Sequence, residues 1–467
     1  MSIQTINPAT EEVLETFETY SREQTNEALQ QAHQAFLQWR TTTFAERAKY
    51  LHRIASYLRD HKGKLAQIAV LEMGKPIIEA EAEVEKCAWN CDFYADNAEK
   101  FLSDEHVQTN ATESYVSFQP LGVVLALMPW NFPYWQVFRF AAPALMAGNT
   151  AVLKHASNVS RCALEIEHIF QECGLPQGVF RTVLVPGAET GYLIADRRVA
   201  AVTLTGSDEA GVAVASASGR ALKKNVLELG GSDAFIVLED ADLDAAAQTA
   251  ARARFQNTGQ SCIAAKRFIV VEAVAEAFEQ KFIEAASKLR IGDPLDRETQ
   301  IGPMARGDLR AGLDKQVQAS INMGAKVLLG GKPLEGKGYF YAPTIITGVT
   351  PDMPLFREET FGPVAAVIHA RDAEHAVELA NDSEFGLGGN LWTRDIERGR
   401  ALARRLESGG VFINGMTASD PRLPFGGVKR SGYGRELSSF GIREFVNIQT
   451  VWIGPAVQAP VTNVASE

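Results

Sequence analysis

Residues 121–133 read LGVVLALMPWNFP, and this stretch decides the fold class. Its uninterrupted apolar run, from Leu121 to Trp130, is well short of the roughly 20 residues that a membrane-spanning helix needs. The segment VVLALM (123–128) has instead the length and composition of a strand that is buried on both faces. The two prolines of PWNFP then fix the backbone of the turn that follows the strand.

The chain after this strand alternates between strand-like and helical segments as far as Gly231. RCALEIEHIFQECG (161–174) is one of the helical segments. Such alternation predicts a parallel sheet that is covered by helices on both faces and binds ligands at the carboxyl ends of its strands. Further strands are expected at AVLK (151–154), FRTVLV (180–185), AAVTLT (200–205) and NVLEL (225–229).

A second unit of the same kind follows. DAFIVLED (233–240) and KRFIVVE (266–272) read as strands, and each precedes a helical segment. We therefore expect two α/β domains, joined near residues 228–232. Later strands are expected at AKVLLGG (325–331), PVAAVIHA (363–370), GNLWT (389–393) and GVFING (410–415).

The segments before and after the two α/β units have a different pattern of apolar residues. Residues 22–105 are rich in Ala, Glu, Gln, Leu and Arg at helical spacing, which predicts amphipathic helices. SYVSFQPLG (114–122) alternates as an exposed strand does, which indicates an arm or an edge strand that pairs with another segment. GIREFVNIQTVWIG (441–454) predicts a terminal strand, and VQAPVTNVASE (457–467) a loose tail.

The composition excludes several classes of function. A net charge of −11 argues against a surface for nucleic acid or for an anionic membrane. The N-terminal MSIQTINPATEEV has no charged head followed by an apolar stretch, so we expect a cytoplasmic protein without a signal peptide. The five cysteines are an odd number, which fits reduced thiols. Cys87 and Cys91 lack further ligands at zinc-site spacing, so we expect them to pack in a helix and expect no metal site.

Cys262 follows the polar, glycine-broken stretch QNTGQS (256–261) and precedes a predicted strand. Its small neighbours, including Ala264, allow close approach by a ligand, and a thiolate is a strong nucleophile. A Cys–His protease would need a histidine partner, and none of the eight histidines lies in a recognisable protease context. Taken alone, a structural cysteine remains the commoner interpretation.

Two further motifs offer polar groups at predicted strand ends. Glu228 in LELGGSD (227–233) is placed where the sheet opens and can act as a general base toward water, or accept hydrogen bonds in a turn. Asn131 lies between the two prolines of PWNFP. A side-chain amide held in this way can donate to a developing oxyanion, or cap the helix that follows.

Three motifs carry weaker signals for a cofactor. LTGSDEAG (204–211) reads as a strand, a turn and a helix start, whose free N–H groups attract phosphate, although it lacks the usual dinucleotide pattern. Lys154 at the end of its strand can bind ribose or phosphate, or remain solvated. Glu359 and Phe361 in REETFGPV (357–364) can bind ribose hydroxyls and pack on a nicotinamide ribose, but each is unremarkable alone.

Together these motifs resemble the aldehyde dehydrogenase superfamily, from INPAT (6–10) to PFGGVKRSGYGRE (424–436), in the order that the family has. The resemblance implies an α/β fold with two Rossmann-like parallel-sheet domains and a small β oligomerisation arm. The implied domains are a dinucleotide-binding domain (1–105 and 124–230), a catalytic domain (231–438), and an arm with a C-terminal strand and tail (106–123 and 439–467).

The resemblance also implies roles for individual residues. Cys262 attacks the aldehyde carbon, and the oxyanion is held by the Asn131 side chain and the Cys262 N–H. The thiohemiacetal passes a hydride to NAD or NADP, and Glu228 activates the water that hydrolyses the thioester. The implied cofactor contacts are Trp130, Lys154, Ser157, Gly206, Ser207, Leu229, Glu359 and Phe361.

Within the family, the chain looks most similar to bacterial NAD(P)-dependent succinate-semialdehyde dehydrogenases. Succinic semialdehyde carries a carboxylate at its far end, which an arginine can hold with two hydrogen bonds. The resemblance places Arg139 and Ser419 in this role. It also places Gln256 where many relatives have a second arginine, a departure that weakens the case for a dedicated pocket.

Ser157 governs the expected choice of cofactor. Relatives with glutamate there favour NAD, because a carboxylate repels the 2′-phosphate of NADP. Serine removes that repulsion, so NADP should be accepted.

Three other functions are alternatives to the oxidation of succinic semialdehyde. They are a dehydrogenase of broad aliphatic and aromatic range, a non-catalytic member of the family, and a variant that transfers the acyl group to coenzyme A. Retention of Cys262 and Glu228 argues against the last two. The arm implies a homodimer or homotetramer.

Overall fold

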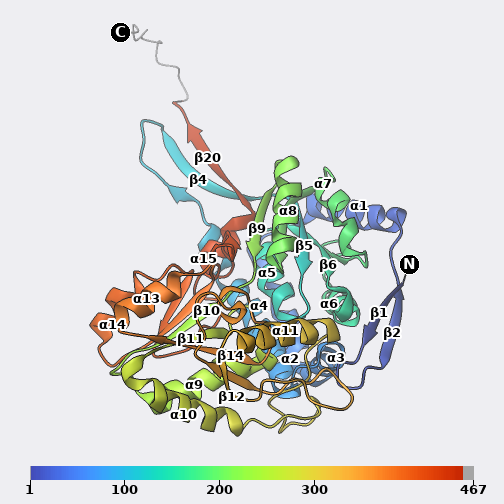
Figure 1. Cartoon of the computed structure of the whole chain (residues 1–467). Helices are drawn as coiled ribbons and strands as arrows, with labels where there is room; N and C mark the ends of the chain where they lie inside the picture. The colour runs from blue at the N-terminus through green and yellow to red at the C-terminus, as the bar shows by residue number, and fades with distance from the viewer. Residues whose placement is uncertain (1, 456–467) are drawn as a thin grey trace.

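Two large sheets, each covered by helices on both faces, form the body of the molecule, and a narrow β arm projects from it (Figure 1). The computed structural model describes residues 2–455, so the predicted tail at 457–467 lies outside the described residues. Within residues 2–455, no helix combines the length and the apolarity that a membrane span requires.

The first sheet has the predicted buried strand at its centre. All six positions of β5, Val123–Met128, are buried, because α5 and α6 cover one face of the sheet and α1 and α8 cover the other. Its neighbours β6 and β8 run parallel to it. The order is β19 (Gly432–Tyr433), β9 (Lys224–Glu228), β8 (Val199–Thr205), β5, β6 (Thr150–His155) and β7 (Phe180–Thr182). The covering helices are α1 (Arg22–Trp39), α5 (Trp135–Met146), α6 (Ser160–Glu172) and α8 (Asp208–Arg220).

One strand of this sheet is shorter than predicted. Pairing of β7 with β6 ends at Thr182, whereas the sequence favoured a strand over 180–185. The carbonyl of Leu184 accepts instead from the N–H of Tyr20, 2.8 Å away. Val183 still donates to the Leu153 carbonyl of β6, but the backbone at Leu184 is bonded to the segment before α1, a long-range partner that local pattern does not reveal.

The second sheet confirms the second predicted α/β unit. Its parallel strands β10, β11, β14 and β16 match the predicted apolar segments. The order is β12 (Lys326–Leu329), β13 (Thr344–Thr347), β14 (Val364–Ala370), β11 (Ala265–Val271), β10 (Asp233–Val237), β16 (Gly388–Trp392) and β17 (Gly410–Ile413). Helices α9 (Leu243–Phe255) and α10 (Ala275–Ser287) cover one face; α11 (Gly307–Asn322), α12 (Pro354–Arg357), α13 (Ala373–Asn381) and α14 (Ile396–Ala403) cover the other.

The predicted N-terminal helices are confirmed. α1 begins at a capping box in which Ser21 and Gln24 satisfy each other's backbone N–H groups, and α2 begins with the same device at Thr43 and Glu46. These helices are α1, α2 (Phe44–Asp60), α3 (Lys62–Met73) and α4 (Ile77–Leu102). A hairpin of β1 (Ser2–Ile6) and β2 (Val13–Glu18), which was not predicted, precedes them. Shorter elements are α7 (Thr190–Ala195), β15 (Phe385–Gly386), β18 (Val428–Lys429) and α15 (Ser438–Ile442).

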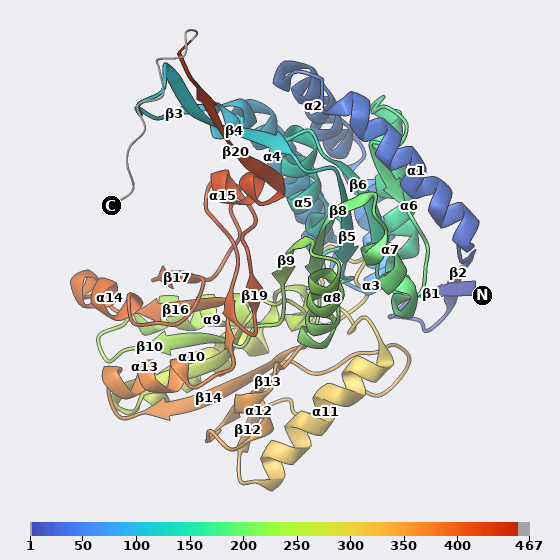
Figure 2. The same ribbon diagram turned by 90° about the horizontal axis from the view of Figure 1, so that it is seen from above.

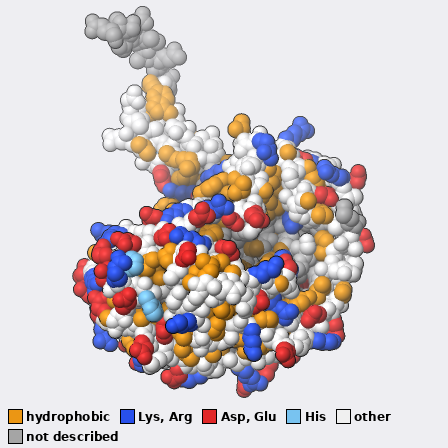
Figure 3. Space-filling model, viewed as in Figure 1, with side chains coloured by type: hydrophobic (Ala, Val, Ile, Leu, Met, Phe, Trp, Pro, Cys, Tyr) orange, Lys and Arg blue, Asp and Glu red, His pale blue; other side chains and the backbone are white. Residues whose placement is uncertain are grey.

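The arm joins segments from distant parts of the chain (Figure 2). β4 (Glu113–Pro120) pairs antiparallel with β20 (Val446–Ile453) along its whole length, and with the short β3 (Glu105–His106) on its other side. The predicted exposed strand and the predicted terminal strand are therefore both confirmed, and they pair with each other. Apolar side chains remain on the arm surface (Figure 3), with Ile448 62% and Trp452 53% exposed.

Candidate active site

Two cavities meet at Cys262, and its side chain lines both. The first, of about 590 Å³, lies at the carboxyl ends of β5, β6 and β8, and we call it the sheet-edge cavity. The second, of about 430 Å³, lies between α4, α5, the end of α9 and residues 416–425, and we call it the α4 cavity. A sulfur at this junction can contact one ligand from each side.

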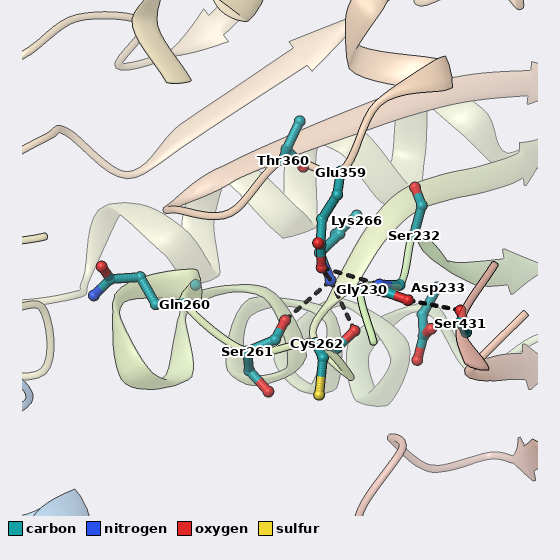
Figure 4. Close-up of polar contacts among 12 residues, drawn as sticks. Gly230, Ser232, Asp233, Gln260, Ser261, Cys262, Lys266, Glu359, Thr360 and Ser431 are labelled. Atoms are coloured by element: carbon teal, nitrogen blue, oxygen red, sulfur yellow. Dashed lines mark hydrogen bonds and ion pairs between the residues drawn. The ribbon is translucent and has the colours of Figure 1, made fainter. Parts of the chain in front are cut away.

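The main chain of Cys262 is held by a lysine that sequence reasoning missed. Lys266, the second residue of the buried strand β11, is fully buried, and its Nζ donates to the carbonyls of Ser261 at 3.0 Å and Cys262 at 2.8 Å. The same ammonium forms an ion pair with Glu359 at 3.2 Å. The Cys262 sulfur points away from this ammonium (Figure 4). One signal in the sequence could have revealed Lys266: it is a charged residue inside a predicted buried strand.

The loop before Cys262 holds unusual backbone conformations. Asn257 and Thr258 have φ of 55° and 54°, in the left-handed region that a β-branched residue such as Thr258 rarely adopts. The side-chain Nδ2 of Asn257 donates to the carbonyls of Asn131 and Gln260, both at 3.0 Å, and so connects the loop to the PWNFP turn. The buried guanidinium of Arg254 donates to the carbonyl of Gly259 at 2.6 Å. These hydrogen bonds stabilise the strained backbone of the loop that leads to Cys262. Strained backbone of this kind is common at active sites.

Asn131 is held in place at the end of β5. Its Nδ2 donates to the carbonyl of Gln260 at 3.2 Å and its Oδ1 accepts from the N–H of Phe132, which leaves one amide hydrogen for a ligand. His155, a second residue missed from the sequence, fixes the same turn from β6. Its Nε2 donates to the Pro133 carbonyl at 2.8 Å, and its Nδ1 accepts from the N–H of Ala156. Burial lowers the pKa of His155 to about 4, so this imidazole is neutral.

Glu228 ends β9 and is almost fully buried. Neither of its carboxyl oxygens has a hydrogen-bond partner within the part of the chain that the structure describes. Burial, together with the nearby charge of Glu436, raises the pKa of Glu228 well above its usual range. The resting side chain is therefore a neutral acid, and it becomes a base only after it loses a proton.

The Cys262 thiol is also protonated at rest. Burial raises its pKa to about 12, although the positive charges of Arg139 and Lys266 act in the opposite direction. Arg139 thus lies close enough to both Cys262 and Glu228 to influence their protonation. The reaction must supply a proton acceptor before the sulfur can attack.

The sheet-edge cavity has the features of a dinucleotide site. Lys154 forms no ion pair or hydrogen bond with the other residues between 2 and 455, so its ammonium is available to phosphate or ribose. Ser207 caps α8, whose free N–H groups face the same space. The rings of Trp130 and Phe361 meet edge to face with centres 5.7 Å apart. All the predicted cofactor contacts except Ser157 line this cavity: Trp130, Lys154, Gly206, Ser207, Leu229, Glu359 and Phe361.

Two of the predicted cofactor contacts differ from the rest. Ser157 begins a short 3₁₀ turn directly after Ala156, which lines the sheet-edge cavity, but Ser157 itself does not line it. Glu359 lines the cavity while it accepts from the N–H of Gly231 at 3.0 Å and pairs with Lys266. The carboxylate is therefore held in one orientation before any ligand binds.

The α4 cavity brings together the three predicted substrate residues. Arg139, Gln256 and Ser419 all line it with Cys262. The Arg139 guanidinium already pairs with Glu436 and donates to Thr205 at 3.2 Å, so its charge is largely balanced. Four further ionisable residues of this cavity were missed, because they lie on helices far from the recognised motifs: Glu79, Glu83 and Lys86 of α4, and Arg252 of α9.

A model of the aldehyde dehydrogenase family matches residues 1–451. The chain belongs to this family. It is 53% identical over 453 residues, which cover 97% of this chain and 100% of the relative, to a probable succinate-semialdehyde dehydrogenase [NADP(+)] of Synechocystis sp. (strain ATCC 27184 / PCC 6803 / Kazusa). It is 52% identical over 447 residues, which cover 96% of this chain and 97% of the relative, to a succinate semialdehyde dehydrogenase [NAD(P)+] of Escherichia coli (strain K12).

Solved structures of aldehyde dehydrogenases have the same fold. A succinic semialdehyde dehydrogenase from Streptococcus pyogenes, in complex with NADP+ as the cofactor, superposes with a TM-score of 0.95 at 40% identity, covering 97% of this chain and 100% of that chain. The fold class and the family resemblance predicted from the sequence are confirmed.

Proposed function

We propose that this aldehyde dehydrogenase oxidises succinic semialdehyde to succinate, with NADP or NAD as the hydride acceptor. The observation that carries the proposal is the position of Cys262, whose side chain lines both a cavity suited to a dinucleotide and a smaller cavity that contains cations. The relatives named succinate-semialdehyde dehydrogenase, at about 50% identity over almost the full chain, support the choice of aldehyde.

The proposed roles follow from the geometry. The Cys262 thiol gives up its proton to water, and the resulting thiolate adds to the aldehyde carbon. The free amide hydrogen of Asn131 and the Cys262 N–H stabilise the oxyanion. When bound, the nicotinamide supplies the hydride acceptor, and the sulfur is left as a thioester. Glu228, in its ionised form, removes a proton from the water that hydrolyses this thioester.

The dinucleotide is held in this proposal by the sheet-edge cavity. Lys154 and the start of α8 at Gly206 and Ser207 bind phosphate and ribose oxygens. Trp130, Leu229 and Phe361 provide apolar contacts, Glu359 accepts from hydroxyls, and Ser157 leaves room for a 2′-phosphate. In the α4 cavity, Arg139, Gln256 and Ser419 contact the substrate.

We also propose the coarser organisation that the family implies. The dinucleotide-binding, catalytic and arm domains take the boundaries given above, and the arm associates copies into a homodimer or homotetramer in the cytoplasm. The exposed apolar side chains Ile448 and Trp452 on β20 support an arm that packs on a partner. The free thiols of all five cysteines support a reducing compartment.

A substrate panel tests the activity. Reduced-cofactor absorbance is followed with succinic semialdehyde, hexanal and benzaldehyde, with NAD and NADP in parallel. We expect kcat/KM for succinic semialdehyde to exceed that for either uncharged aldehyde at least tenfold. Similar values for all three would favour the alternative, a dehydrogenase of broad aldehyde range.

A further inference from the structure

The α4 cavity contains a lysine that has no acidic partner in the part of the chain that the structure describes. Lys86, on α4, donates from Nζ to the Ser419 hydroxyl at 2.6 Å and lies 4.3 Å from the centre of the Trp135 ring. Among residues 2–455, no carboxylate lies within ion-pairing distance of this ammonium. Its hydrogen bond and its ring contact orient Lys86 without neutralising it.

The acids around Lys86 are already engaged by other groups. Glu83 pairs with the buried Lys75 and accepts from the N–H groups of Tyr134 and Trp135, at 2.8 and 2.9 Å. Asp420 accepts from Arg422 through both of its carboxylate oxygens, at 2.9 and 2.6 Å. Glu436 pairs with Arg139. The charge of Lys86 therefore remains for whatever enters the cavity.

The environment of Lys86 penalises that charge. Burial, followed by the like charge of Arg139, lowers its pKa to about 8. A partly buried cation without a counter-charge costs free energy, and an anionic ligand would remove that cost. The cavity thus favours a bound carboxylate more strongly than an exposed lysine would.

The rest of the cavity suits a short carbon chain. Apolar side chains line it together with the cation and the sulfur, and its volume of about 430 Å³ leaves room for a small molecule. A short aldehyde can then place its carbonyl at Cys262 and its far end near Lys86. The apolar lining residues used here are Phe132, Trp135, Ile263 and Phe425.

We propose that Lys86, with Ser419, binds the far carboxylate of the substrate and so determines the preference for aldehydes that carry one. The inference rests on the proposed oxidation of succinic semialdehyde at Cys262. Arg139 lines the same cavity, but Glu436 already balances its charge. Arg252 also lines the cavity, but its side chain is exposed to solvent, whereas Lys86 is partly buried and has no ion-pair partner among residues 2–455. The Ser419 hydroxyl supplies a neighbouring hydrogen bond.

The test compares succinic semialdehyde with butanal, which ends in a methyl group where the semialdehyde ends in a carboxylate. In Lys86→Gln, whose amide can keep the bond to Ser419, we expect KM for succinic semialdehyde to rise about 10- to 100-fold. kcat/KM for butanal should stay within about threefold. Lys86→Met should behave alike, and Lys86→Arg should restore much of the loss. Lys100→Met, at an exposed lysine near the end of the same helix, is the matched control and should match wild type.

The outcomes separate this inference from the proposed function. A wild type that does not prefer succinic semialdehyde over butanal would overturn the proposed function itself. A wild type with that preference, and a Lys86→Gln variant that keeps it, would overturn the role of Lys86. Parallel loss of both activities in Lys86→Gln and Lys86→Arg would make Lys86 a structural residue and would equally contradict the inference.

Discussion

The two cavities that meet at Cys262 are built in different ways. The sheet-edge cavity is formed by the ends of parallel strands and lined by main-chain groups, the cap of α8 and Lys154, which has no ion-pair partner among residues 2–455. The α4 cavity is formed by helix side chains and a loop, with Lys86 and Arg139 among its walls. A cofactor shared by many enzymes suits the first construction, whereas a particular aldehyde needs the second. Specificity for the aldehyde can therefore change without disturbing the sheet.

Removal of the residue that the cavities share should have the largest effect. In Cys262→Ala we expect oxidation to fall at least about 1,000-fold, because the covalent step is lost. Binding of NADPH, measured by its fluorescence, should persist, because the sheet-edge cavity keeps its other walls. Cys173→Ala, at a buried cysteine of neither cavity, is the matched control and should keep its activity. Residual turnover in Cys262→Ala above a few per cent would contradict the assignment.

Glu228→Gln should have the next largest effect, because Glu228 acts in the hydrolysis of the thioester, which follows hydride transfer. We expect kcat to fall about 100- to 1,000-fold, while the first turnover still yields a burst of reduced cofactor. In wild type the ionised carboxylate is the active form and its pKa is raised, so the steady-state rate should increase with pH as this carboxyl ionises. The part of the increase that comes from Glu228 should be lost in the variant. Stopped-flow absorbance that shows no burst would assign Glu228 to an earlier step.

Ser157→Glu sharpens the comparison on the cofactor side. A carboxylate there should lower kcat/KM for NADP about tenfold or more by repulsion of the 2′-phosphate, and that for NAD at most about twofold. KM for succinic semialdehyde at saturating NAD should not change, because the α4 cavity is untouched. Initial rates measured with NAD and with NADP test this prediction. An equal loss with NAD and NADP would show that the residue at position 157 does not determine the preference between the two cofactors.

A smaller effect of pH should appear only on the aldehyde side. We expect the ratio of kcat/KM for succinic semialdehyde to that for butanal to fall about three- to tenfold as pH rises through about 8. The reason is that neutral Lys86 no longer attracts the carboxylate, and the ratio cancels the ionisation of Cys262. The charged or titratable groups that act on Lys86 are Arg139 of α5, Glu83 and Cys87 of α4, and Asp420 of the loop.

A second acid can contribute to this pH profile. Glu79 lines the same cavity and has its pKa raised to about 7 by burial, so its ionisation adds repulsion as pH rises through about 7. Lys86→Arg should remove the step near pH 8 and keep the one near pH 7. A ratio that is flat with pH in wild type would argue against an ionising lysine in substrate binding.

The same comparison shows how far the sequence could predict the site. Strand ends of a parallel sheet gather at one edge, so local pattern alone places Asn131, Lys154 and Glu228 together. Helix periodicity says that α4 has a buried face but not which turn of it borders a cavity, so Lys86 escaped prediction. Lys266 escaped because its partners are carbonyls of a loop whose left-handed residues, such as Thr258, have no clear local signal.

The pairing of β4 with β20 has a consequence for biosynthesis. All the strands of the two large sheets are encoded between these two strands, so β4 leaves the ribosome well before β20 does. The sheets can therefore begin to form while translation continues, but the arm must wait until β20 has been synthesised. Any assembly that depends on the arm is then confined to chains that already carry both sheets, which keeps shorter nascent chains from joining one another.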